Sequence, residues 1–178
     1  GFHCACSLGH IELAELLIKN SVDYNIDLNT KDDNGSTGYA LSSGQVKIVE
    51  LLIKNSVDYN IDLNTKDAKG WTGFHYACTK RHIELVEFMI KNSEECNIDL
   101  NAKDKYGATG FHKACWDGYV KIVELLIKNS VECNIDVNAK NDYDSTGFHY
   151  ACKRGHFELV ELLIKNSEEF NIDLNAKR

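Results

Sequence analysis

The sequence predicts an all-α solenoid in which pairs of helices stack on one another and hairpin-like loops project to one side. Two observations carry this prediction. The tetrapeptide Ile-Lys-Asn-Ser begins at positions 18, 53, 90, 127 and 164, with spacings of 35, 37, 37 and 37 residues. The tripeptide Asn-Ile-Asp follows seven residues later in every copy. A period of this size is typical of stacked repeat units, whose stability comes mainly from contacts between neighbours.

The period also sets the expected organisation of the chain. We expect a single repeat domain over residues 1–178, with a truncated repeat at 1–28, complete repeats at 29–63, 64–100, 101–137 and 138–174, and a stub at 175–178. The second repeat is two residues shorter than the others, and the loss falls between Gly38 and Gly44. Neither end shows a polar capping repeat, so we expect a piece of a longer protein.

Each repeat reads as turn, helix, turn, helix. In the third repeat, residues 67–70 form a turn that ends on glycine, and the Thr72 hydroxyl can cap the helix that follows. The second helix is expected from residue 83 to about residue 91, and its apolar content predicts packing between neighbours. Arg81 and Asp144 occupy positions that hold glycine in other repeats, so we expect a positive φ at both.

The repeat resembles the ankyrin repeat over the whole chain. Residues 72–77 read Thr-Gly-Phe-His-Tyr-Ala, which is similar to the family pattern T-P-L-H-x-A. Residues 82–87 resemble the start of the family's second helix, and residues 99–104 resemble its hairpin. Two features depart from the pattern, because glycine replaces the proline and the unit has 37 residues where the family usually has 33. The resemblance implies an ankyrin-type solenoid of helix-turn-helix repeats that acts in protein recognition.

The extra residues of each unit fall between the second helix and the hairpin, for example at 57–60 and 94–97. We expect an additional helical turn there, ended by an asparagine in the left-handed conformation. One column of side chains in this segment is then expected to pack on the next repeat: Tyr24, Tyr59, Cys96, Cys133 and Phe170.

Seven histidines and seven cysteines raise the alternatives of a metal site or a thiol enzyme. Their periodicity favours structural roles, because none has the short spacing of zinc ligands and the pair His75/Cys78 recurs in later repeats. We therefore expect no metal, no cofactor, no catalytic residue and no enzymatic activity. The resemblance implies that one histidine column forms hydrogen bonds between adjacent loops: His3, His75, His112 and His149.

Composition excludes several classes of partner. The net charge is −7, which argues against nucleic acid, a ligand that usually requires a basic surface. No apolar run approaches the roughly 18 residues of a membrane helix, so no membrane insertion is expected. No small-molecule substrate is expected either.

The cysteine count is odd, no CxxC occurs and no secretory signal is visible, which favours an intracellular, cytoplasmic protein with reduced thiols.

Comparing the repeats with one another shows where they differ. The variable positions lie at the hairpin tip, at the end of the first helix and in one column within that helix. In the ankyrin family the first two regions line the concave groove that binds proteins. Both tryptophans lie in these regions, and tryptophan and tyrosine are enriched at interface hot spots. The predicted partner-binding residues are Lys69, Trp71, Tyr76, Lys80, Lys105, Tyr106, Lys113, Trp116, Asp117, Tyr143, Tyr150, Lys153 and Arg154.

The sequence thus favours a scaffold for protein–protein interaction that binds a protein partner through this variable concave face. Aromatic anchors and nearby cations would contribute most of the affinity. The alternative is a structural spacer within a longer array, with no ligand of its own. The identity of the partner is not encoded in any pattern of the sequence. The expected anchors are Trp71, Tyr106, Trp116 and Tyr143, and the expected charge contacts are Lys69, Lys105, Lys153 and Arg154.

Overall fold

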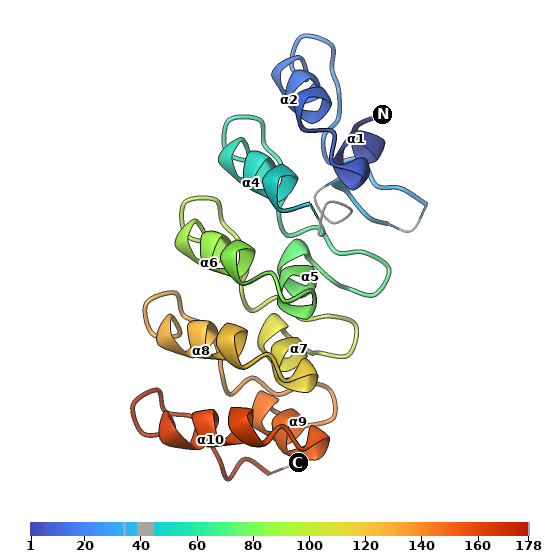
Figure 1. Cartoon of the computed structure of the whole chain (residues 1–178). Helices are drawn as coiled ribbons and strands as arrows, with labels where there is room; N and C mark the ends of the chain where they lie inside the picture. Colours follow the sequence, from blue (N-terminus) through green and yellow to red (C-terminus); the bar gives the residue numbers. More distant parts are fainter. Residues whose placement is uncertain (34, 39–44, 178) are drawn as a thin grey trace. The chain divides into compact units, whose positions relative to one another are not determined.

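The structure is a computed structural model, and it describes residues 1–33, 35–38 and 45–177. Over these residues it contains nine α-helices and no strand, which confirms the all-α prediction (Figure 1). The chain divides into two compact units, Gly1–Asp99 (unit 1) and Leu100–Arg178 (unit 2). The two-residue loss between Gly38 and Gly44 falls on residues 39–44, which lie outside the described residues.

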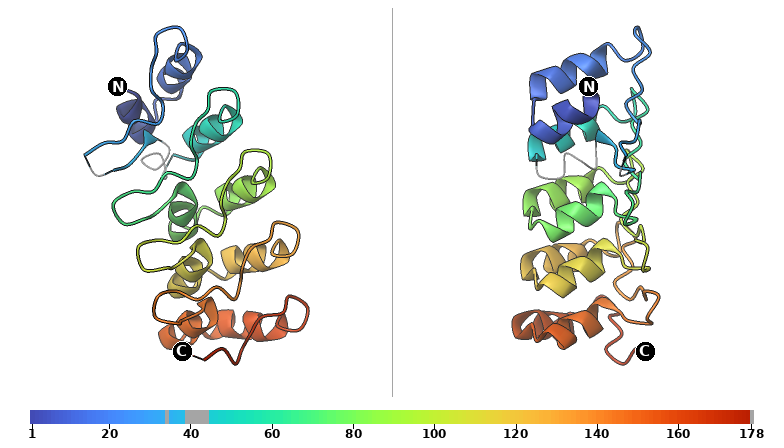
Figure 2. Two further views of the ribbon diagram at one scale, coloured as in Figure 1. Left: turned by 180° about the vertical axis from the view of Figure 1, so that it is seen from behind. Right: turned by 90° about the vertical axis from the view of Figure 1, so that its right-hand side faces the viewer.

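Apart from α4, the described helices of each unit form pairs, each joined by a short connection. Unit 1 contains α1 (Phe2–Leu8), α2 (Ile11–Lys19), α4 (Val46–Lys54), α5 (Gly73–Thr79) and α6 (Ile83–Lys91). Unit 2 contains α7 (Gly110–Asp117), α8 (Val120–Lys128), α9 (Gly147–Arg154) and α10 (Phe157–Lys165). In unit 2, α7 packs beside α9 and α8 beside α10. In unit 1, and again in unit 2, the long loops lie to one side of the helices (Figure 2).

The second helix of each pair is buried between neighbours, as its apolar content predicts. Helix α6 spans the expected residues 83–91 and buries Leu85, Val86, Met89 and Ile90. In unit 2, α8 buries the corresponding four apolar positions. Full burial of such a side chain contributes about 1.5–3 kcal/mol to the free energy of unfolding. The buried apolar side chains of α6 and α8 therefore supply much of the stability of their units. In the described part of unit 2, buried apolar residues lie on helices that contact the neighbouring helix pair, α7 against α9 and α8 against α10, as expected of a repeat array.

A threonine–histidine pair caps the first helix of the later repeats. At α7, the Thr109 N–H donates to His112 Nδ1 at 3.2 Å, and the Thr109 hydroxyl lies 2.9 Å from the same nitrogen. The other ring nitrogen, Nε2, lies 2.9 Å from the Ser145 carbonyl oxygen in the next loop. Because Nδ1 accepts, Nε2 carries the proton and donates. The expected threonine cap is confirmed, and so is the inter-loop role of His112.

An asparagine ladder joins successive loops. In unit 1, Asn64 Nδ2 donates to the Asn97 carbonyl at 2.6 Å, and Asn64 Oδ1 accepts from the Asp99 N–H at 2.8 Å. In unit 2, Asn101 makes the same two bonds to the Asn134 carbonyl and the Asp136 N–H. Both ends of each side-chain amide therefore hold the backbone of the following repeat, which fixes the position of one loop against the next.

The four extra residues of each repeat form a separate turn instead of prolonging the second helix. Helix α6 ends at Lys91 because the next two side chains bond back to it, Asn92 Nδ2 to the Phe88 carbonyl and Ser93 Oγ to the Ile90 carbonyl. A single turn follows, closed by the Cys96 N–H on the Asn92 carbonyl at 3.0 Å. The expected left-handed asparagine is confirmed in every repeat, with a φ of 51° at Asn25, Asn60, Asn97, Asn134 and Asn171.

The expected packing direction of the column in this turn is wrong in unit 1. The Cys96 thiol donates to the Ile53 carbonyl, at 3.6 Å, which belongs to the preceding repeat. Tyr24 holds the same position in the first repeat and is 74% exposed. At this position the segment therefore contacts the repeat before it and not the one after it.

Two non-glycine residues take the left-handed conformation that their positions predict. Arg81 has a φ of 60° and Asp144 a φ of 55°. Gly118, at the position of Arg81, has a φ of 72°, and Gly107, at the position of Asp144, has a φ of 73°. A side chain with a Cβ in this region costs about 1–2 kcal/mol, and an arginine has no local hydrogen bond to offset that cost as an aspartate can.

We predict that Arg81→Gly stabilises unit 1 by about 0.5–1 kcal/mol, because relief of the strain exceeds the added entropy of the unfolded chain. Urea unfolding followed by Trp71 fluorescence in a Trp116→Phe background measures the change. Lys80→Gly is the matched control, since Lys80 has a φ of −93° and gains nothing from glycine. An unchanged or lower midpoint for Arg81→Gly contradicts the prediction.

Candidate functional site

The hairpin tip is built on one buried side chain at its base. In the fourth repeat this is Asp104, whose Oδ1 accepts from the backbone N–H groups of Tyr106 and Ala108 at 2.8 and 2.9 Å. Its Oδ2 accepts from Lys113 Nζ at 2.6 Å, which ties the tip to α7. Burial alone raises the pKa of Asp104, but the bonds from Lys113 and from the two N–H groups hold it below its ordinary value.

The same arrangement recurs with other residue pairs. In the third repeat, the Tyr76 hydroxyl donates to Asp67 Oδ2 at 2.7 Å. Burial and this carboxylate raise the pKa of Tyr76 to about 12. In the fifth repeat, Asn141 Nδ2 donates to the Tyr150 hydroxyl. Three predicted partner-binding residues therefore hold the hairpins in place, namely Tyr76, Lys113 and Tyr150.

Sequence reasoning did not identify the side chains at the foot of each hairpin tip, namely Asp67, Asp104 and Asn141. A signal exists for them, because aspartate or asparagine precedes each tip by two residues, the spacing of a side chain that accepts from the backbone in a turn. Their effect is to give every tip the same backbone while its exposed residues differ between repeats. The tips are thus fixed supports for variable side chains.

In unit 1, Trp71 lies against its own repeat. Its ring makes an edge contact with Tyr76 at 5.1 Å between centroids and stacks on His75 at 6.3 Å. Lys69 Nζ lies 5.6 Å from the Trp71 ring. Lys80, at the end of α5, is exposed. Trp71 is half-buried, so it presents part of its ring to solvent and is held in one orientation by its neighbours.

In unit 2, Trp116 lies at the centre of a cluster formed with Tyr150, Lys153 and Arg154, which we call the Trp116 cluster. Trp116 belongs to the last turn of α7, and the other three belong to α9, which packs beside it. Tyr150 contacts the Trp116 ring edge-on at 5.1 Å. Arg154 Cζ lies 4.9 Å and Lys153 Nζ 5.8 Å from the ring centroid, within the range of cation–π attraction. Trp116 remains 36% exposed.

A hydrogen bond to the backbone at the end of α7 holds the chain at Trp116 in position. His156 Nε2 bonds the Trp116 carbonyl oxygen at 2.9 Å, and the His156 ring occupies the space next to Gly118. A Cβ on Gly118 would lie 2.7 Å from His156 Nδ1, so the histidine depends on a glycine there. Asp117 is exposed beside the cluster, and partial burial raises its pKa against the opposing charge of Arg154.

The remaining predicted residues lie at the hairpin tips of unit 2. Tyr106 and Tyr143 are 48% and 61% exposed, and Lys105 Nζ lies 5.0 Å from the Tyr106 ring. Within the described part of each unit, the structure therefore gathers aromatic residues with cations, as the variable columns suggest. Whether these surfaces bind a partner stays a prediction.

The pair Cys78 and His75 is arranged for packing. Cys78 is fully buried, and burial raises the pKa of its thiol far above the ordinary value, which suppresses the nucleophilic thiolate. Its presumed base, His75, has Nδ1 occupied by the Thr72 cap. Among the described residues no group of three or more His, Cys, Asp or Glu side chains is placed to hold a metal ion.

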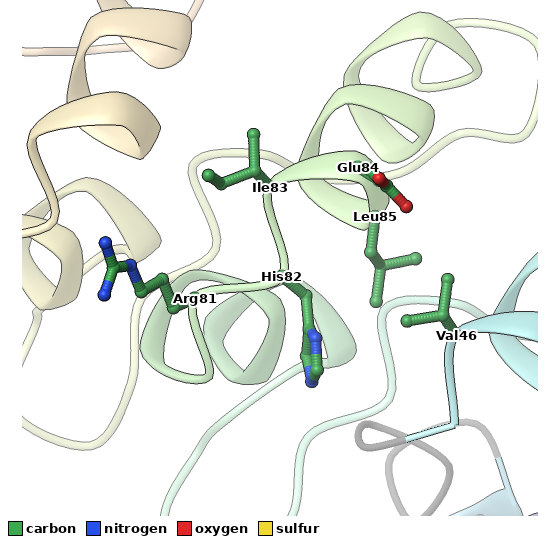
Figure 3. Close-up of a pocket in the computed structure, with 6 residues that line it drawn as sticks. All are labelled: Val46, Arg81, His82, Ile83, Glu84 and Leu85. Carbon is green, nitrogen blue, oxygen red and sulfur yellow. The ribbon is translucent and has the colours of Figure 1, made fainter.

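One open cavity of about 230 Å³ lies in unit 1, between the start of α4 and the start of α6. It is lined by Val46, Arg81, His82, Ile83, Glu84 and Leu85 (Figure 3). Figure 3 shows the Arg81 side chain directed away from His82 and Val46. The lining contains one histidine and one acid, His82 and Glu84, but Figure 3 shows their side chains pointing in different directions, so they do not form an acid–base pair.

No helix in the described ranges combines the length and the apolar character that crossing a bilayer requires.

Models of known protein families match most of the chain. A model described as ankyrin repeats in three copies matches residues 1–67 and 56–141. A second model, described as ankyrin repeats in many copies, matches residues 131–178. No curated protein matches the chain.

Proposed function

Because the chain belongs to the ankyrin-repeat family, whose members are generally modules for protein–protein interaction, we propose that it binds a protein partner through its variable positions. Members of the family are typically not enzymes. The proposal treats residues 1–178 as one repeat domain that acts as a scaffold. Its aromatic anchors would be the tryptophans and the tyrosines of the hairpin tips, with the flanking lysines and Arg154 as charge contacts.

The observation that carries this proposal is the Trp116 cluster. A tryptophan that is merely tolerated at a surface has no need of three ordered neighbours from another helix. Here Tyr150 and two cations hold the Trp116 ring in place while leaving 36% of it exposed. An aromatic side chain that is ordered before binding loses little entropy on contact, which is the property of a hot-spot residue.

The alternative proposal is a structural spacer without a ligand. The asparagine ladder and the repeated buried rows of α6 and α8 would suit that role, since they make each repeat a rigid module. The two proposals differ in one respect. A spacer depends on the buried columns only, and its exposed tips can change freely without loss of function.

We predict that changing Trp71, Tyr106, Trp116 and Tyr143 together to Ser abolishes capture of the partner in affinity purification from cells of the source organism, read by mass spectrometry. The physical reason is that a few aromatic anchors carry most of the free energy of binding. The matched control changes four exposed apolar residues elsewhere to Ser, namely Val22, Val57, Val131 and Phe157, which are 64–80% exposed.

Two checks keep the result interpretable. Far-UV circular dichroism and thermal unfolding show whether each variant is folded, and the smaller variant Tyr106→Ser/Tyr143→Ser removes only residues that are about half exposed or more. Proteins lost with the aromatic variants and kept with the control support recognition. Identical sets of captured proteins for all variants contradict it and favour the spacer.

A further inference from the structure

We propose that the Trp116 cluster binds the carboxylate side chains of an acidic segment in the partner protein, with Arg154 and Lys153 as the cations that receive them. This inference rests on the proposed function and names the chemistry of the partner. The occupant is a short stretch of polypeptide in which Asp or Glu residues adjoin an apolar side chain. The apolar side chain packs on the exposed part of the Trp116 ring.

The first argument comes from two cations that stand outside any ion pair, although the charge of Arg154 acts at longer range on Asp117. The ion pairs found in the described part of unit 2 join Lys113 to Asp104 and Lys128 to Glu124. Within residues 100–177, neither Lys153 nor Arg154 lies within ion-pair distance of a carboxylate. Both are exposed and adjacent in sequence. Both side chains belong to the last turn of α9, where the helix dipole favours a positive charge.

The second argument comes from orientation. The Arg154 guanidinium carbon lies 4.9 Å from the Trp116 ring centroid, so the group is held against the ring. The N–H donors of a guanidinium lie in its own plane at the periphery, and they match the two oxygens of a carboxylate. Lys153, 5.8 Å from the same ring, supplies a second positive charge nearby. A stacked, pre-ordered cation pair loses less side-chain entropy when it binds than two free side chains would.

The third argument comes from the charge of the chain as a whole. With a net charge of −7, the chain repels a long polyanion such as nucleic acid. A short acidic segment carries its charge within a few residues, so screening by salt reduces repulsion from the rest of the chain while contact with the cluster remains. The cluster is therefore a local cationic site on an acidic molecule, which suits carboxylates of a protein segment.

Selection of short random peptides displayed on phage, carried out at about 0.15 M ionic strength against the intact 178-residue chain, tests the inference. The expected result is enrichment of Asp and Glu beside an apolar residue, relative to the starting library. Binding of the selected peptides should weaken about tenfold in Lys153→Gln/Arg154→Gln, because both charge contacts are lost. The control Lys121→Gln removes an exposed positive charge from α8 and should leave binding unchanged.

The outcomes separate this inference from the proposed function. Selected peptides that are not acidic, or acidic peptides that bind Lys153→Gln/Arg154→Gln as well as the unchanged chain, overturn the inference. If such peptides still lose binding in Trp116→Ser, the proposed function stands without it. Selection of no peptide, or of peptides indifferent to Trp116→Ser, counts against both. Competition by inorganic phosphate stronger than by free glutamate identifies the site as one for phosphate and likewise overturns the inference.

Discussion

Replacing Gly147 with alanine is expected to destabilise unit 2 by about 2 kcal/mol, although the change adds a single methyl group. Gly147 is the first residue of α9, and a Cβ there would lie 2.5 Å from Phe111 Cε1 and 2.9 Å from Cys115 Sγ. Both neighbours are almost fully buried, so neither can move away without disturbing the layer between α7 and α9. Urea unfolding followed by Trp116 fluorescence in a Trp71→Phe background measures the loss.

A double-mutant cycle tests the cause. Phe111→Leu alone should cost about 1 kcal/mol, because the ring leaves a small cavity. With Phe111→Leu in place, Gly147→Ala should cost little, which gives a coupling free energy of about 1–2 kcal/mol. Gly1→Ala is the matched control, since Gly1 holds the same position in the first repeat and has nothing within 4 Å of its Cβ. Additive effects of the two changes contradict the explanation.

This contact also explains the main departure from the family pattern. Where the pattern has proline and leucine, these repeats have glycine and phenylalanine. A proline at position 147 would place ring carbons where the Phe111 ring lies, and Phe2 makes the same approach to Gly38 in unit 1. The two replacements are therefore linked between neighbouring repeats. Sequence analysis recorded the glycine as a departure but could not connect it with the phenylalanine of the preceding repeat, because Gly147 and Phe111 lie 36 positions apart.

Local structure was predictable because it depends on residues that are close in sequence. The threonine cap at Thr109, the left-handed Arg81 and Asp144, and the bounds of α6 all follow from short motifs and their period. The packing direction of Cys96 was not predictable, because the contact that shows it joins residues 43 positions apart in two different repeats.

The candidate site shows the same limit. Variation among repeats identified Trp116, Lys153 and Arg154 correctly as variable positions, but it could not show that they meet around one ring. Variation also selected Lys113 and Tyr150, which the structure places against Asp104 and Asn141. A position varies either because partners differ or because its intramolecular contact differs, and the sequence of one repeat does not separate these two causes.

Acid is expected to weaken unit 2 through His112. This residue is fully buried, and the pKa of its side chain is lowered by burial and by the nearby charges of Lys113 and Lys103, in spite of the bond to Ser145. The folded chain therefore binds this proton less readily than the unfolded chain, whose histidine has a pKa of about 6.5. The stabilising contribution is complete above that value and is lost as the pH falls below it, by up to about 1 kcal/mol between pH 7 and pH 5.5.

Changing His112 to Gln should remove this pH dependence and also lower stability at pH 7 by about 2–3 kcal/mol, because the Thr109 N–H and the Ser145 carbonyl lose a buried partner. Urea unfolding at pH 7 and pH 5.5, read from Trp116 in the Trp71→Phe background, gives both quantities. His10→Gln is the control, since His10 is exposed and makes no side-chain cap. The decisive comparison is the slope with pH. If His112→Gln and the unchanged chain lose equal stability on acidification, protonation of other groups causes the loss, and the histidine acts only as a helix cap and a link between loops.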